Sequence, residues 1–433
     1  MSLNLLPAKT SRLSFFVLLG FFCLSLVYFI SRGPLRPVDL NKCDFTLIYF
    51  GSSFWVKGLS PYNHNEINKL CFKIDEPADK SEPITYVRPA VYPITIFPII
   101  APLTFMKLPD AKFVWNIINC LAFFGAFLAL ISYSKLKILE KDAILICCLA
   151  LSLNPIHRAI NEGNPSALAC SLMVISLWAA DRDHAVLGGI LFALTLCLKV
   201  HATLIFLLYF ILTKKYKLLL VSILSTTLIL LIAIIPSGLN LEWLYAWRSN
   251  VNAAFSGGIN DIHQVKAIGY LNLDYVAIKF INNITIIKII VLFLFLGYTT
   301  LLYRYNKFVE YNYKNLMLLS YVVVVGLLLI PYQRFTNGVV LIFPIALAFL
   351  WRRNHLINYG NIMLILLIPF LFPLSAIIDY FMKKYNYYWL INSPWFNCII
   401  YGNRTWLLLI MSMVMIRVMQ VNYLKCHSSR IRG

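Results

Sequence analysis

One acidic residue stands out in this sequence because of where it lies. Asp44 comes shortly after an apolar segment at 13–31 and begins a run of small and aromatic residues that ends at Gly58 and a turn at 59–62. The run predicts a short amphipathic helix on a membrane surface, closed by a Gly/Pro break. An acid at that place can remove a proton from a substrate hydroxyl. Alternatively, Asp44 only caps the helix, because Asp is a favoured N-cap residue.

Other charged residues are expected at the outer ends of membrane spans, where they are functional candidates because charge is costly in lipid. In chain order they are Arg88, Arg158, Glu162, Lys199 and Arg334. The cations of such a cluster can hold an anionic leaving group such as a lipid phosphate, while a carboxylate takes the proton of an acceptor hydroxyl. The alternative for each cation is that it snorkels to the interface or pairs with a neighbouring acid.

The composition assigns the chain to the membrane. Of 433 residues, 60% are hydrophobic and only 13% are charged, with a mean hydropathy of +0.75, which excludes a soluble globular protein. The net charge of +20 indicates membrane topology rather than a nucleic-acid partner. There is no nucleotide-binding motif and no metal-ligand spacing, so we expect no cofactor and assign no metal site. Cys43 and Cys71 lie in one outer loop, where a disulfide is one alternative in an oxidising compartment.

The apolar segments predict an all-α polytopic membrane protein of about twelve transmembrane helices, organised as a single domain over 1–433. The spans are expected at 13–31, 112–133, 143–160, 166–180, 185–201, 203–213, 218–236, 284–303, 315–331, 338–351, 357–378 and 405–423. Lys and Arg cluster at alternate junctions, which predicts cytoplasmic N- and C-termini. The unusual polar residues then face outward, in a first outer loop at 33–111, a long outer loop at 237–283 and shorter turns.

Residues 86–106 are apolar enough to span the membrane but contain Pro89, Pro93, Pro98 and Pro102. Each proline removes a backbone hydrogen bond that lipid cannot replace. We therefore predict a broken or re-entrant juxtamembrane helix on the outer face. Because this segment does not cross, the later basic clusters stay on the cytoplasmic side.

Several short motifs follow one another in a recognisable order. They are Asp44 with Tyr49 and the run 58–62, Tyr86-x-x-Pro89-x-x-Tyr92-Pro93, Pro102-Leu103, Leu108-Pro109, Trp115-x-x-x-Asn119, Glu162-Gly163-Asn164, and Gly188-Gly189 leading to Lys199. In this order the chain resembles the integral-membrane GT-C glycosyltransferases, specifically the family-87 type that includes polyprenol-phosphate-mannose-dependent α-1,2-mannosyltransferases. The resemblance covers the first half of the chain well and the second half weakly.

The resemblance implies a GT-C-like fold and an inverting glycosyltransferase that moves a sugar from a polyprenyl-phosphate donor to a glycolipid or glycan acceptor. It also implies that Asp44 is the general base. We assign Lys199, Arg158, Arg334 and Arg88 to the donor phosphate, Glu162 to sugar hydroxyls, and Asn164 and Tyr49 to substrate binding. The expected location is a bacterial inner membrane, with the active site on the extracytoplasmic face.

Two departures from the usual family pattern leave the donor sugar open. The usual Gly-Gln-x-Asn reads Glu162-Gly163-Asn164 followed by Pro165, and the turn that often carries paired histidines, at 331–337, contains none. Two other functions stay open: a transporter or flippase for lipid-linked sugars, and a lipid-linked glycan ligase or polymerase that uses the loop 237–283. Polar residues at the outer ends of spans, rather than at mid-membrane depth, favour the transferase over the transporter.

Overall fold

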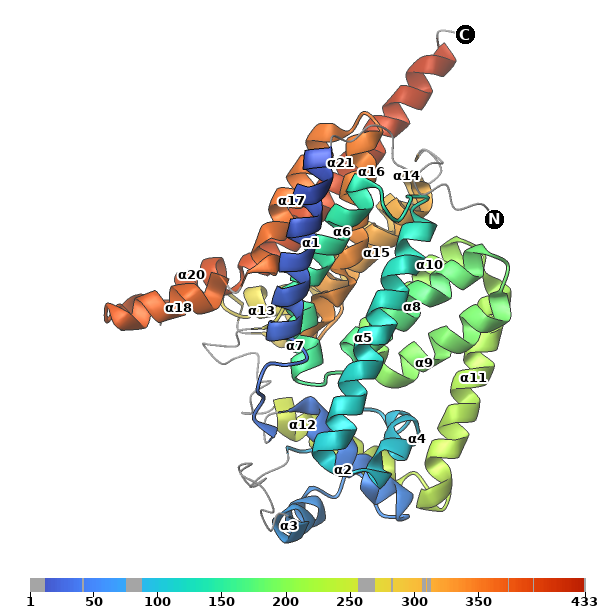
Figure 1. Ribbon diagram of the computed structural model, residues 1–433, viewed down its shortest axis with the longest axis vertical. Helices are drawn as coiled ribbons and strands as arrows, with labels where there is room; N and C mark the ends of the chain where they lie inside the picture. Colours follow the sequence, from blue (N-terminus) through green and yellow to red (C-terminus); the bar gives the residue numbers. More distant parts are fainter. Residues whose placement is uncertain are drawn as a thin grey trace.

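The computed structural model describes residues 12–40, 43–74, 88–255, 269–281, 283–305, 309, 313–372, 374–391 and 393–431. Within these ranges the regular secondary structure is helical, apart from one isolated antiparallel bridge between Tyr270 and Arg334 (Figure 1). The prediction of an all-helical chain is therefore confirmed for the described residues.

Seven helical segments of the described chain are long and apolar enough to cross a membrane. They are α1 (Arg12–Arg32), α5 (Leu108–Tyr133), α9 (Ala185–Thr203), α11 (Tyr216–Ile234), α14 (Ile284–Tyr305), η5 (Phe335–Leu341) continued by α16 (Ile342–Arg353), and α21 (Asn403–Ile431). The pair α6 (Lys141–Ser152) and α7 (Asn154–Asn161) is bent by 50° and makes an eighth span if it is counted as one. The structure thus supports a multi-pass membrane protein.

The other apolar helices inside the predicted spans are short. α8 (Ser166–Asp181) and α15 (Lys314–Leu329) have 16 residues each, α17 (Ile357–Leu371) has 15, and α10 (Ile205–Leu212) has 8. A straight helix needs about 20 residues to cross a bilayer. The helical segments therefore lie where the sequence predicts them, but a count of twelve spans is not confirmed.

The centre of the bundle is formed by α15 and by η5 with α16. Every residue of α15 from 316 to 329 is buried, and 94% of the Phe335–Arg353 span is buried. By contrast, only 11% of α1 and 17% each of α11 and α14 are buried within their apolar windows. A helix that is apolar on all sides belongs in the interior of a bundle, whereas apolar side chains left exposed suit contact with lipid.

The predicted Gly-Gly motif lies where α9 packs against α8 and α11. A Cβ atom on Gly189 would lie 2.6 Å from Cβ of Val221 in α11, and one on Gly188 would lie 3.1 Å from the carbonyl oxygen of Ser176 in α8. Only a residue without a side chain permits this approach. The close packing fixes the helix that carries Lys199.

A second, smaller apolar cluster lies at one end of the bundle. Here α2 (Asp44–Val56) packs against α4 (Ile96–Ile100), η2 (Ala101–Phe105) and the first half of α5, with α3 (His64–Ile74) and α12 (Glu242–Phe255) beside them. Figure 1 shows this group at the end of the molecule opposite the C-terminal end of α21. The indole N–H of Trp55 ties α2 to α11 through the carbonyl oxygen of Ala233, at 2.7 Å.

The expectation that α2 is an amphipathic surface helix is wrong. Residues 45–48 are all buried, because α4, η2 and α5 cover the helix, and only Asp44 in its first turn is partly exposed. The described part of the proline-rich segment forms only α4 and η2, and Ile96–Phe105 is too short to span by itself. Cys43 is a free, buried cysteine, and the side chain of Cys71 lies outside the described residues.

The remaining helices are short. They are η3 (Ile235–Ser237), α13 (Leu273–Ala277), α18 (Leu374–Lys384), α19 (Tyr388–Ile391), α20 (Pro394–Phe396) and the π-helical η6 (Asn397–Tyr401). Of the predicted outer loop at 237–283, the structure describes α12, α13 and their immediate flanks, and 256–268 with 282 lie outside the described residues. In Figure 1, α18 and α20 extend sideways from the bundle.

Candidate active site

The first turn of α2 is attached to the turn that follows α7. The backbone N–H of Phe45 donates to the carbonyl oxygen of Glu162 at 3.1 Å, and the thiol of Cys43 donates to the same oxygen at 3.0 Å. The N-cap residue of α2 is Cys43, and Asp44 is the first helical residue. Burial raises the pKa of the Cys43 thiol, which keeps it protonated as a donor. The capping alternative for Asp44 therefore has no support in this geometry.

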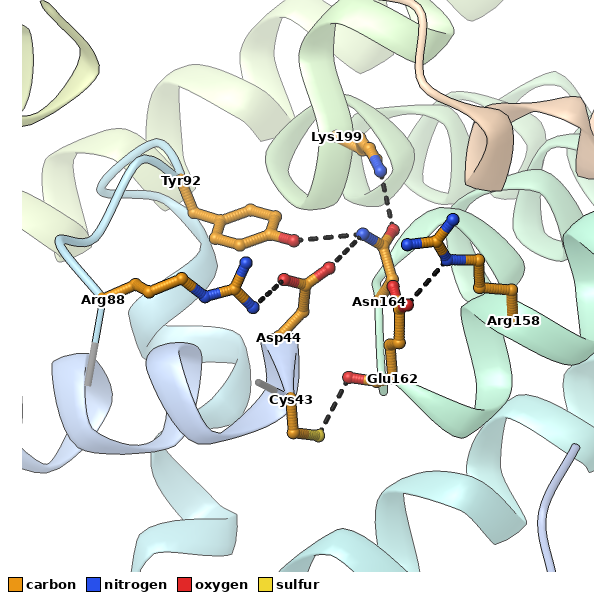
Figure 2. Close-up of polar contacts among 8 residues, drawn as sticks. All are labelled: Cys43, Asp44, Arg88, Tyr92, Arg158, Glu162, Asn164 and Lys199. Carbon is orange, nitrogen blue, oxygen red and sulfur yellow. Dashed lines mark hydrogen bonds and ion pairs between the residues drawn. The ribbon is translucent and has the colours of Figure 1, made fainter. Parts of the chain in front are cut away.

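The Asp44 carboxylate is held from two sides. The amide nitrogen of Asn164 donates to Oδ2 at 2.6 Å, and the guanidinium of Arg88 donates to Oδ1 at 3.3 Å (Figure 2). Both partners are donors, as an acceptor-only ionised carboxylate requires. The side chain of Asp44 is 19% exposed. It is thus fixed in direction while part of it stays accessible to a substrate.

Asn164 is the centre of the polar network. Its amide oxygen accepts hydrogen bonds from the ammonium of Lys199 at 2.6 Å and from the hydroxyl and backbone N–H of Ser166 at 2.6 and 3.0 Å. Because all these groups are donors, the oxygen must face them and the NH₂ group must face Asp44. The same NH₂ group lies 3.3 Å from the hydroxyl of Tyr92.

The buried side chain of Lys199 holds Asn164 and Ser166 in this arrangement. It is only 4% exposed, and its ammonium donates to the hydroxyl of Ser166 as well as to Asn164. The backbone of Lys199 is not helical (φ −158°, ψ 76°), so α9 is kinked there. The sequence assigned Lys199 to the donor phosphate, whereas here its hydrogen bonds go to protein groups that hold Asp44.

Arg158 and Glu162 form an ion pair within one turn of α7. The two side chains are joined by a hydrogen bond of 2.6 Å and are 39% and 25% exposed. α7 begins after a break at Leu153 and carries Pro155 in its first turn, which suits a helix start because proline lacks the N–H. The bend between α6 and α7 brings this pair beside the head of α2, as Figure 2 shows.

Arg334 lies in the turn between α15 and η5. Its guanidinium is 5.7 Å from the ring centroid of Tyr270 and hydrogen bonds with Tyr332. The charges of Asp44 and Lys199 are both close enough to Arg334 to interact with it. Burial raises the pKa of Tyr332, so its phenol remains protonated. The structure therefore brings Arg334 to the same site as Asp44.

Tyr49 is not brought to the carboxylate. Its hydroxyl donates to the carbonyl oxygen of Met106 at 2.7 Å and so ties α2 to the segment after η2. Trp115, from the same set of sequence motifs, donates its indole N–H to the carbonyl oxygen of Gly163 at 3.0 Å. These motif residues fix the backbone around the site.

Sequence reasoning missed Tyr92 and Ser166 as site residues. Tyr92 is buried and lies beside Asn164, and burial together with the nearby Asp44 charge raises its pKa well above 10.0, so its phenol stays protonated. Its position in the Tyr86-to-Pro93 motif was the available signal. Ser166 begins α8, and nothing in the sequence marks it as a site residue except its position directly after the Glu162-to-Pro165 stretch.

Gly163 allows the turn after α7 to approach α2, and we expect Gly163→Ala to destabilise the protein. The residue has φ +63°, and a Cβ atom there would lie 2.5 Å from Cβ of Phe45. A left-handed backbone and a forced shift of α2 together cost about 1–3 kcal/mol. Thermal unfolding of the purified protein in detergent should show a lower apparent Tm. The matched control is Gly297→Ala in α14, where nothing lies within 4 Å of the added Cβ and a small gain is expected. Equal Tm values for the two variants would contradict this description of the turn.

Taken together, the fold and the site define an all-helical membrane protein with an oriented carboxylate among cations at one end of its bundle. Over residues 90–331, more than half of its length, the chain matches the model of glycosyltransferase family 87. The chain belongs to this family and is a transferase enzyme. It matches no curated protein and no solved structure.

The matched region contains part of the site. It includes Tyr92, α7, Asn164 and Lys199, whereas Asp44, Arg88 and the turn from Tyr332 to Arg334 lie outside it. The roles of the residues outside the region are therefore argued from the contacts described above.

Proposed function

We propose that this family-87 enzyme is an inverting glycosyltransferase of GT-C type. It moves a sugar from a polyprenyl-phosphate donor to a hydroxyl of a glycolipid or glycan acceptor. The observation that carries the proposal is the Asp44 carboxylate, held by Arg88 and Asn164 and surrounded by further cations. The family assignment favours this enzyme over a transporter of lipid-linked sugars.

The proposed step is a single displacement. An acceptor hydroxyl oxygen forms the new bond to the anomeric carbon, and the bond from that carbon to the phosphate oxygen breaks with its electron pair staying on the phosphate. Asp44 receives the hydroxyl proton. Because the two bonds exchange on opposite faces of the carbon, the anomeric configuration inverts, as it does when a carboxylate base activates the nucleophile in inverting glycosidases.

The leaving polyprenyl phosphate gains negative charge during this step. Cations outnumber carboxylates among Asp44, Glu162, Arg158, Lys199 and Arg334, which interact electrostatically across the site. Preorganised positive charge stabilises an anion that develops in the transition state. We assign Arg158 and Arg334 to the phosphate, Glu162 to sugar hydroxyls, and Lys199 with Asn164 to the orientation of Asp44.

The proposed orientation places the active site on the extracytoplasmic side of a bacterial inner membrane, with both termini in the cytoplasm. Its support is the positive-inside rule. Figure 1 shows the C-terminal ends of α5, α10 and α16 at the end of the bundle away from α2. Basic residues lie in the last turn of these helices or directly after them, namely Lys135, Lys137, Lys214, Lys215, Arg352 and Arg353. There Arg353 forms ion pairs with Glu140 at 2.7 Å and with Asp142 at 3.8 Å.

The donor class is tested with the purified chain in detergent or nanodiscs. We expect transfer from at least one member of a panel of polyprenyl-phosphate sugars, with one polyprenyl phosphate released per sugar transferred. Mannose is one member of the panel and has no special status, because the departures at 162–165 and 331–337 leave the sugar unassigned. Transfer from nucleotide sugars alone, with every lipid donor inert, would contradict the proposal.

A further inference from the structure

A buried cation that the sequence reasoning did not consider lies at the start of α21. Arg404 is 5% exposed, and its Cζ atom lies 4.0 Å from the ring centroid of Phe335. Its Nε has no hydrogen-bond partner, and across the described residues its side chain makes no hydrogen bond and no ion pair. Arg404 is therefore a buried charge that no described acid or acceptor compensates.

Such a charge is costly in the absence of an anion. A guanidinium removed from water is destabilising unless an ion pair, hydrogen bonds or a bound anion compensate its charge. The stacking of Arg404 on Phe335 compensates only part of this cost. Arg158 adds to the deficit, because its positive charge is close enough to repel that of Arg404.

Contacts around Phe335 place Arg404 at the edge of the active site. Phe335 follows Arg334 directly, and its backbone N–H donates to the carbonyl oxygen of Gly269 at 2.6 Å. The guanidinium of Arg158 lies beside Gly269, because a Cβ atom built there would be 3.9 Å from its Nη1. Arg404, Arg158 and Arg334 therefore converge on two paired stretches of chain, 269–270 and 334–335, and they come from α21, from α7 and from the turn before η5.

We propose that Arg404, together with Arg158, binds the phosphate group of the lipid-linked donor. The proposal rests on the function proposed above and adds to it a phosphate contact from the last helix. A guanidinium suits this role because its planar fork gives two parallel hydrogen bonds to phosphate oxygens. The N-terminal end of α21, where Arg404 lies, adds the partial positive charge of the helix dipole on the same side.

The competing description is that Arg404 only packs on Phe335. The two descriptions differ in the unliganded protein. If the guanidinium is an uncompensated charge, Arg404→Gln removes a buried cation and should leave the apparent Tm unchanged or raise it. If Arg404 is mainly a packing element, the same substitution should lower the apparent Tm, because its contact with the Phe335 ring is lost.

The direct test measures binding of polyprenyl phosphate to the full chain in detergent, with the uncharged polyprenol as the matched ligand. We expect the parent to prefer the phosphate, Arg404→Gln to bind it at least about 10-fold more weakly, and Arg404→Lys to retain part of the affinity. Polyprenol binding should not change. The control variant is Arg417→Gln, which removes an exposed arginine from the same helix and should bind like the parent.

Three outcomes overturn the proposal, and they are distinguishable. If Arg404→Gln binds polyprenyl phosphate as the parent does, the assignment of Arg404 fails while the proposed function stands. If the parent binds polyprenyl phosphate no better than polyprenol, the donor class itself fails and this inference fails with it. If Arg404→Gln weakens only the binding of a diacyl phosphatidate, used as a second probe, the phosphate at Arg404 belongs to another lipid and not to the donor.

Discussion

The Asp44→Asn variant is expected to transfer sugar roughly 10²–10⁴ times more slowly than the parent, which is the usual contribution of a general base. Asn keeps the size and shape of the side chain, but it cannot accept the proton of the acceptor hydroxyl, and it loses the acceptor oxygen that faces Asn164. The contact from Arg88 at 3.3 Å can be kept by the Asn carbonyl oxygen. The loss should therefore appear in kcat, with little change in the KM for the donor.

The matched control for this substitution is Asp110→Asn. Asp110 is an exposed acid in the first turn of α5 and has no part in the proposed site, so its substitution should leave the rate unchanged. If Asp44 acted only as a helix cap, Asn would serve nearly as well, because Asn and Asp rank together at that position. Near-parental kcat in Asp44→Asn would thus remove the general base from the mechanism.

The Lys199→Met variant is expected to lower kcat by about 10²-fold while the donor KM stays nearly constant. Lys199 donates to the amide oxygen of Asn164, and Asn164 in turn donates to Asp44. Removing the ammonium frees the amide to rotate and lets the carboxylate shift, and a misplacement of about 1 Å in a catalytic group costs a factor of this size. Steady-state kinetics with a varied donor concentration separate the two parameters.

The kinetic pattern distinguishes positioning from phosphate binding at Lys199. A lysine that held the donor phosphate would raise the KM when removed, and that result would contradict the positioning role. Lys199→Arg should recover part of the activity only if its longer side chain still reaches Asn164. The control is Lys215→Met, because the Lys215 ammonium also donates to protein, to the carbonyl oxygen of Ala180 at 2.9 Å, but lies at the cytoplasmic end of the proposed orientation.

The helical segments were predictable because hydrophobicity alone locates them. Each predicted span overlaps at least one helix of the described residues, from α1 to α21, although twelve spans are not confirmed. Their lengths were not predictable in the same way. A continuous apolar run does not reveal where a helix breaks, and the bend at Leu153 and the kink at Lys199 divide runs that hydropathy joins. About twelve apolar runs correspond to only seven or eight helical segments long enough to cross, because α8, α10, α15 and α17 have 16 residues or fewer.

Within the site, the sequence predicted which charged and polar side chains take part, but it did not predict which of them form hydrogen bonds with one another. Asp44 and Asn164 are separated by 120 positions in the chain but share a hydrogen bond of 2.6 Å, which only tertiary packing can produce. The same limit applies to Tyr49, because its spacing from Asp44 within one helix does not predict its hydrogen bond to the carbonyl oxygen of Met106. It also explains why the burial of α2 was not predicted, because the helices that bury α2 come from 96–105 and 108–133, far from it in the sequence.

The most direct test of the proposed mechanism is the single-turnover rate of Asp44→Asn with a polyprenyl-phosphate sugar already bound, measured beside the affinity of the same variant for that donor. We predict that the variant binds the donor as tightly as the parent within a few-fold and that transfer to the acceptor is slowed by roughly 10² or more. Bound donor that is transferred at the parental rate would contradict the account, because the proton of the acceptor would then be leaving through some other group.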